Sequence, residues 1–281
     1  MADPFSITTG VVGIVVPALH ATRLLLDDLR KISDAPSTVE ALREDVAFVE
    51  ATLESLKAVG QPQWTALGAT VAEQLEHAIV SCTTSCTKFR ADLQRWTRHS
   101  TGCDISWRDR AGLGFFRESQ IKAMSEQLQK YRATLNLVIS TATLHSSIRG
   151  KRVTEELKAA ITDKEKNITD SITSTDQQLT TVDTRLQQLH PAEGRGQTTS
   201  GMVDEDEAGM RRVIGEEQAI LRVLLALLEG LKLKTQEEAK KMAEEERKQS
   251  MHVTFGNNNS DFQLGANSGS ISGFTFGGRG V

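Results

Sequence analysis

Apolar side chains recur every three or four positions along most of the chain, a spacing that predicts α-helices. Residues 4–22 form the first apolar stretch and carry no formal charge. Three more stripes with helical spacing follow it, from Val39 to Leu56, from Leu67 to Trp96 and from Ile121 to Ala142. Four helices of this kind, separated by short breaks, predict an N-terminal antiparallel helical bundle over residues 1–150.

The pattern beyond residue 150 is more polar. Residues 151–189 carry a sparse apolar stripe with heptad-like spacing, which predicts a long amphipathic helix of coiled-coil character. Residues 190–209 have the composition of a linker. Residues 210–250 begin with a dense apolar block and end in mixed charges, which predicts a long helix with a solvated end. The predicted fold class is therefore all-α, with a disordered Gly/Asn/Phe tail at residues 251–281.

Composition supports helix and narrows the function. Only 5% of the residues are aromatic and the chain has one Tyr, which disfavours a sheet-rich fold. The 33 basic and 37 acidic side chains are interspersed, so no basic surface for nucleic acid is indicated. Three Cys form no disulfide pattern, and the N-terminal segment lacks the basic residues of a signal peptide, which predicts a cytoplasmic location.

The uncharged first helix has two interpretations. Its length is close to the ~20 residues that span a bilayer, so it is a candidate membrane-directed helix. Gly10, Gly13 and Pro17 make it a poor permanent span, and a buried first helix of the bundle explains the same pattern. Both interpretations can hold at different times, with membrane association following activation. The side chains expected to serve in either state are Val11, Val12, Val15, Leu24 and Leu25.

The tail from Phe255 to Val281 differs in kind from the rest of the chain. It holds four of the nine Phe and seven of the 21 Gly, and only Asp261 and Arg279 are charged. This composition suits either a disordered tail or a segment that stacks into cross-β with other copies. The residues expected to drive self-assembly are Asn259, Phe262, Gln263, Leu264 and Gly265.

One group of residues points to metal chemistry. Cys82, Cys86, His99 and Cys103 have the number and spacing of a small zinc module. Cys82 and Cys86 also continue an apolar helical stripe, so packing in the bundle is the favoured interpretation. The sequence contains no phosphate-binding loop with lysine, no HExxH and no GxSxG. We therefore expect no catalytic residue, no metal and no cofactor.

The N-terminal segment carries a family resemblance. The opening Met1–Ile7, MADPFSI, followed by a glycine-punctuated apolar helix, resembles the fungal N-terminal domain family named after azaphilone pigments biosynthesis cluster protein L. The order of helix, Pro36, helix, Trp64 and helix fits that family over residues 1–150, and at its widest to residue 230. The family is similar to the HeLo-like helical domains of fungal regulated cell death.

A second resemblance lies in the tail. Asn259–Gly265, NSDFQLG, is similar to the fungal amyloid signalling pattern N-x-G-x-Q-x-G and to the animal necroptosis motif with a Gln-Gly core. Asp261 stands where the fungal pattern has Gly, and Phe262 stands where the animal motif has Ile or Val. A charge stacked in register repels its copies, so we expect Asp261 to slow assembly.

Together the two resemblances imply a non-enzymatic, self-assembling and membrane-directed effector of fungal programmed cell death. Its partners would be other copies of the chain, membrane lipid and a receptor with a similar tail motif. The alternative is a non-catalytic accessory protein of azaphilone pigment biosynthesis, a polyketide pathway.

Overall fold

The computed structural model describes residues 4–33, 35–97, 105–106, 114–149, 154–188 and 201–250. The side chains of residues 4–10, 12, 33, 105, 106, 114–117, 201–208 and 248–250 are outside that description. The helices are α1 (Pro4–Arg30), α2 (Ser37–Lys57), α3 (Gln61–Leu67), α4 (Ala69–Thr97), α5 (Gly114–Ile148), α6 (Glu155–Gln188) and α7 (Gly201–Ser250). The prediction of an all-α fold is confirmed, because the strands in this part of the chain are two two-residue segments, β1 (Ile32–Ser33) and β2 (Ile105–Ser106).

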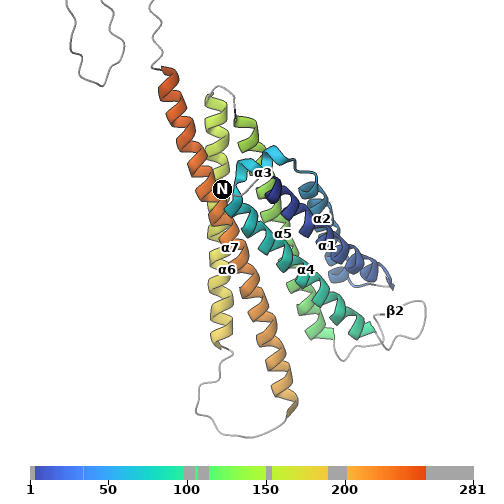
Figure 1. The fold of residues 1–281 in the computed structure, drawn as a ribbon. Coiled ribbons are helices and arrows are strands. Elements are labelled where there is room, and N and C mark those ends of the chain that lie inside the picture. The colour runs from blue at the N-terminus through green and yellow to red at the C-terminus, as the bar shows by residue number, and fades with distance from the viewer. Residues whose placement is uncertain are drawn as a thin grey trace, which may run out of the picture.

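Successive long helices run in opposite directions, as the bundle prediction requires. Helix α1 contacts both α2 and α4, α2 packs on α5, and α7 lies against α4 and α5. Helix α6 packs mainly on α7, and the two form a long hairpin along one side of the bundle (Figure 1). Helices α1 and α4 are parallel, since β1 follows α1 and pairs in parallel with β2.

The apolar core is shared by the bundle and the hairpin. It includes Val11 of α1, Leu42 of α2 and Leu128 of α5. It continues through side chains of α6 and α7, namely Ile168, Ile220, Leu224, Leu227 and Leu231. The bundle predicted for residues 1–150 therefore shares its core with later helices. Two smaller apolar clusters lie elsewhere. The cluster around Ile161 joins the hairpin to Ile148 at the end of α5, and the cluster around Val182 lies within the hairpin.

The third predicted helix is two helices in the structure. Helix α3 ends at Leu67, and α4 begins at Ala69 after Gly68, whose φ is +84°. Side chains disfavour this backbone region and glycine tolerates it, so Gly68 permits the change of direction. The buried Trp64 of α3 anchors the corner by donating its indole N–H to the Val59 carbonyl at 3.1 Å.

The start of the last helix also differs from the prediction. We expected a linker over residues 190–209, but α7 already begins at Gly201. The sequence from Asp204 to Glu207 is entirely acidic, and negative charge near a helix N-terminus favours the helix. The linker prediction is therefore wrong for residues 201–209, and residues 189–200 lie outside the described part of the chain.

Candidate functional site

Helix α1 buries its apolar face in the bundle. Val11, Val15 and Leu25 are fully buried, and Leu24 is partly buried. The side chain of Val12 lies outside the described residues. This burial agrees with the resting interpretation of the first helix, and a membrane role for the same residues stays a prediction.

Ion pairs and hydrogen bonds hold the C-terminal half of α1 against α2 and α4. Arg23 bonds Glu50 and Glu54 of α2 at 2.7 and 2.6 Å. Asp28 accepts hydrogen bonds from Arg90 and Gln94 of α4 at 2.7 and 2.9 Å. Burial alone would raise the pKa of Asp28, but hydrogen bonds from Lys31, Arg90 and Gln94 lower it. The carboxylate is therefore charged at neutral pH and keeps this contact with α4.

The N-terminal half of α1 has no such fastening. It contains no Asp, Glu, Lys or Arg from Pro4 to Thr22, so it cannot form ion pairs of this kind, and its described side chains Val11 and Val15 pack in the apolar core. Pro17 lies inside the helix and has no N–H to donate to the carbonyl one turn earlier. Among the described helices, none is both long and apolar enough to cross a membrane.

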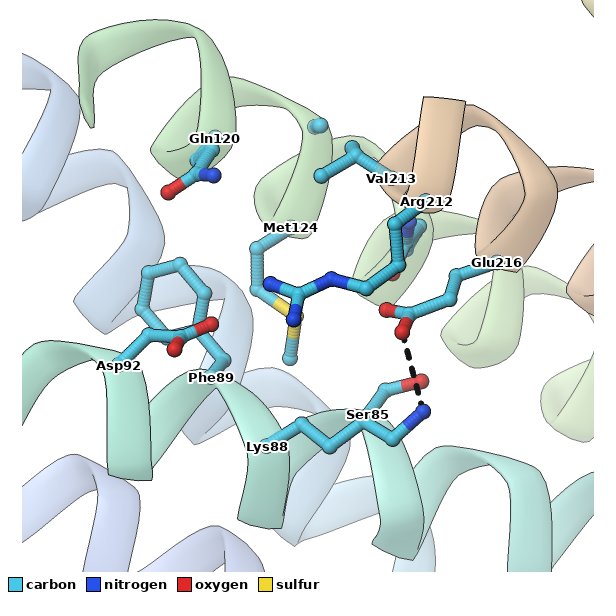
Figure 2. Close-up of a pocket in the computed structure, with 11 residues that line it drawn as sticks. Ser85, Lys88, Phe89, Asp92, Gln120, Met124, Arg212, Val213 and Glu216 are labelled. Atoms are coloured by element: carbon cyan, nitrogen blue, oxygen red, sulfur yellow. Dashed lines mark hydrogen bonds and ion pairs between the residues drawn. The ribbon is translucent and has the colours of Figure 1, made fainter. Parts of the chain in front are cut away.

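A small pocket opens where α4, α5 and α7 meet (Figure 2). Lys88 of α4 and Glu216 of α7 form an ion pair at 3.0 Å along its edge, and the Arg212 side chain extends into it from α7 (Figure 2). Asp92 is paired with Arg95 at 3.1 Å. The cavity volume is about 60 Å³, which holds a few water molecules and is well below the ~300 Å³ of a small-molecule site.

Two larger but open grooves lie between α5, α6 and α7. Their volumes are about 450 and 330 Å³, and both are lined by Lys130, Ala133 and Gln178. Glu217 lies between Lys130 and Arg185, at 3.6 and 3.7 Å. Threonine, serine and glutamine side chains make up much of the remaining lining.

The two central cysteines of the zinc-like group are packed in the core. Cys82 and Cys86 are both fully buried, which confirms the packing prediction. The adjacent Cys86 thiol, together with burial, raises the pKa of Cys82 well above its ordinary range, which opposes the thiolate that a metal needs. His99 and Cys103 lie outside the described residues. In the ranges that the structure covers, no three His, Cys, Asp or Glu side chains are grouped to hold a metal ion.

Two buried polar groups escaped the sequence analysis. Asp45 of α2 accepts hydrogen bonds from Ser125 and Gln129 of α5, the latter at 3.0 Å. His145 of α5 is fully buried. The sequence does indicate that both side chains are buried. Asp45 lies three residues after Leu42 and His145 lies three residues after Ala142, so both continue the apolar stripes of their helices.

The residues predicted to drive self-assembly lie outside the described part of the chain: Asn259, Phe262, Gln263, Leu264 and Gly265. Their role stays a prediction from the sequence.

The shared apolar core, the inward-packed first helix and the small pocket define a helical-bundle protein. The family model described as pigment biosynthesis cluster protein PigL N-terminal matches residues 2–224, and the chain belongs to this family. No curated protein and no solved structure matches the chain. The match confirms the N-terminal resemblance and extends beyond the bundle into α7.

Proposed function

We propose that this chain is a non-catalytic interaction protein that rests as a helical bundle and acts by self-assembly at a membrane. Helix α1 is the element that meets lipid. The observation that carries the proposal is the contrast within α1, between an uncharged N-terminal half and a C-terminal half fastened at Arg23 and Asp28. Fungal cell-death signalling is the setting that the HeLo-like resemblance favours.

The energetics of α1 support release only where another apolar environment is present. The ion pairs of Arg23 and Asp28 are at least partly exposed, and water screens such pairs so that each contributes little to stability. Transferring Val11, Val15 and Leu25 to water costs roughly 1.5–3 kcal/mol per side chain. Lipid or other copies of the chain can provide this burial again, whereas water cannot.

The mode of membrane contact follows from the same helix. Because no described helix is long and apolar enough to cross a bilayer, α1 is proposed to lie in the interface, with the uncharged apolar surface of residues 11–19, Val16 included, toward the acyl chains. Several copies held together by the tail motif would place their α1 helices side by side. A receptor with a similar tail motif is the proposed trigger.

The polar groups of the pocket support a role without catalysis. Lys88 and Glu216 neutralise each other, and Asp92 is paired with Arg95. The first pair joins α4 to α7 and the second lies within α4, and the remaining space of about 60 Å³ is too small for an organic substrate.

The test uses two matched valines. Val16 of α1 and Val80 of α4 are each 51% exposed, so a charge at either position leaves the core intact. We expect Val16→Asp to reduce dye leakage from anionic phospholipid vesicles severalfold, because a charge on the lipid-facing helix opposes insertion. Val80→Asp should leak like the unaltered chain. Equal leakage from both variants, or none from the unaltered chain at any concentration, contradicts the membrane role.

A second function, an accessory role in pigment biosynthesis, is favoured by the description of the family. In that case deletion of the gene should abolish azaphilone pigment in a producing fungus. A Val16→Asp copy should then restore the pigment as well as the unaltered copy does. Restoration by the unaltered copy alone would favour the membrane role.

A further inference from the structure

A buried histidine lies where α5 meets the C-terminal half of α7. The His145 ring is fully buried, and neither of its nitrogens has a hydrogen-bond partner. The Thr141 hydroxyl, one turn earlier on α5, is also buried without a partner. Unsatisfied polar atoms in an apolar interior are costly, so this junction is a weak point in an otherwise well-packed interface.

Helix α7 places charged groups opposite the ring. Glu238 is only 7% exposed, and Lys241 and Lys234 lie 3.0 and 3.4 Å from its carboxylate. Thr235 is fully buried, but its hydroxyl is engaged with the Leu231 carbonyl. The carboxylate that could attract a charged imidazole is therefore already paired with two lysines.

The charges around His145 are mostly positive. Lys234 and Lys241 of α7 and Arg149 at the end of α5 oppose a proton on the ring, and Glu238 alone among the main charged neighbours favours it. Helix α3 carries no charged residue, and its Thr65 carbonyl accepts a hydrogen bond from the Arg149 guanidinium. On α6, Lys164 donates a hydrogen bond to the Ser140 hydroxyl of α5. The ionisable side chains near the start of α4, which are Glu73, Glu76 and His77, are not buried.

Charging the ring is thus disfavoured as long as α7 is packed on α5. Burial, opposed in part by Glu238, lowers the pKa of His145 to about 4. Once α7 moves away, water reaches the ring and the ordinary value of about 6.5 returns. Protons therefore bind the open form in preference to the closed form across this pH range.

We propose that the contact between His145 and α7 is an acid-released latch, and that proton uptake by His145 frees residues 231–247 of α7 from the bundle. This half of α7 lies beyond the family match, which ends at residue 224, and it leads directly to the tail. Acidification would therefore detach a segment that lies outside the family match, while Ile220, Leu224 and Leu227 of α7 keep their places in the main core. The proposal is independent of the membrane role of α1.

The test is hydrogen exchange of the full chain at pH 7.5 and pH 5.0, corrected for the intrinsic pH dependence of amide exchange. From the two pKa values, the opening equilibrium of residues 231–247 should rise about 30-fold between these conditions. His145→Leu, which cannot take up a proton, should abolish the rise. His20→Gln, which alters an exposed histidine of α1, should retain it.

Three results would overturn the proposal: the same rise in His145→Leu, an equal rise in every helix, or no rise in the unaltered chain. If His145→Leu does not fold, an imidazole titration of the unaltered protein by NMR decides the matter. A ring that stays neutral in the closed form at pH 5.0 supports the latch. A ring that titrates near pH 6.5 with α7 still packed contradicts it.

Discussion

The central bundle and the α6–α7 hairpin are held together by different interactions. Helix α2 buries eight side chains within 21 residues, whereas α6 buries three within 34. The hairpin compensates with polar contacts between its helices. These include Lys158 with Glu246 at 2.5 Å, Gln218 with Asp183 at 2.5 Å and Gln236 with Glu165 at 2.7 Å.

This difference indicates where the molecule can open. Apolar burial contributes the larger share of stability, while exposed polar pairs contribute little. Helix α6 is therefore the least firmly held long helix, and α7 is intermediate because one of its faces belongs to the main core. Local opening is expected to begin in the hairpin and to reach the bundle last.

The largest expected effect on the free energy of unfolding comes from truncating an isoleucine to alanine, and the same change can be made in both regions. Ile79→Ala in the main core should lower the free energy of unfolding by ~4 kcal/mol, near the upper end for such cavities. Ile161→Ala in the small hairpin cluster should cost about 2 kcal/mol, because that site can collapse more easily. Urea unfolding followed by circular dichroism measures both, and equal losses would remove the distinction between the regions.

Acid should weaken the junction between the two regions. The pKa of His145 is about 4 in the folded chain and about 6.5 when exposed, so the unfolded chain binds more protons between these values. Stability is complete above pH 6.5 and falls as the pH drops toward 4, by up to ~3 kcal/mol. Asp28 acts at lower pH, since its lowered pKa affects stability only near and below its ordinary value of 3.8.

Urea midpoints at pH 7.5 and pH 4.5 measure this loss, and His145→Leu should reduce it. A loss of the same size in that variant would assign the acid sensitivity to other groups.

A close approach between α4 and α7 offers a sharper test of the interface. A Cβ at Gly230 would lie 1.9 Å from the Gln74 side-chain oxygen, so Gly230→Ala should cost ~1 kcal/mol by displacing that side chain. In a Gln74→Ala background the clash is gone, and Gly230→Ala should stabilise by ~0.5–1 kcal/mol through helix propensity. Thermal unfolding of the four proteins measures the reversal of sign, and a cost in both backgrounds would show that Gly230 serves another contact.

The smallest effect is expected at the open end of the hairpin. Lys158 pairs with Glu246 across the helices and with Glu155 on its own helix, and all three are partly or largely exposed. Lys158→Ala should lower the unfolding midpoint only slightly, and 1 M salt should remove most of the difference. Chemical denaturation at low and high salt tests this. A salt-independent loss would mean that the lysine stem contributes through packing.

The sequence predicted the parts of this fold that depend on local periodicity. The stripes around Val46, Ile79 and Leu128 indicated helices and their buried faces, because a 3.6-residue period places these side chains on one side. The break at Gly68 depends on one backbone angle that no periodicity reveals. The start of α7 at Gly201 was missed because polar, glycine-containing composition outweighed the acidic helix-start signal.

The apolar periodicity of the sequence does not predict contacts between segments that are far apart in the chain. Asp28 and Arg90 are 62 positions apart, and their pairing follows from the parallel packing of α1 and α4. Asp45 and His145 could have been recognised as buried from their positions in the stripes, but their surroundings depend on which helices adjoin them. Asp45 found hydrogen-bond donors on α5, while His145 found none.

The extension of the core past residue 224 affects the growing chain. Leu227 and Leu231 cover side chains of helices that are made much earlier. At ~5–20 residues per second, synthesis from Ile148 to Leu231 takes roughly 4–17 s, and the surface that α7 will cover is bare during that time. A fragment cut at residue 224 would keep Ile220 and Leu224, but the part of the surface that Leu227 and Leu231 cover would stay exposed permanently. The second half of α7 thus completes the bundle late in synthesis, although it lies outside the family match.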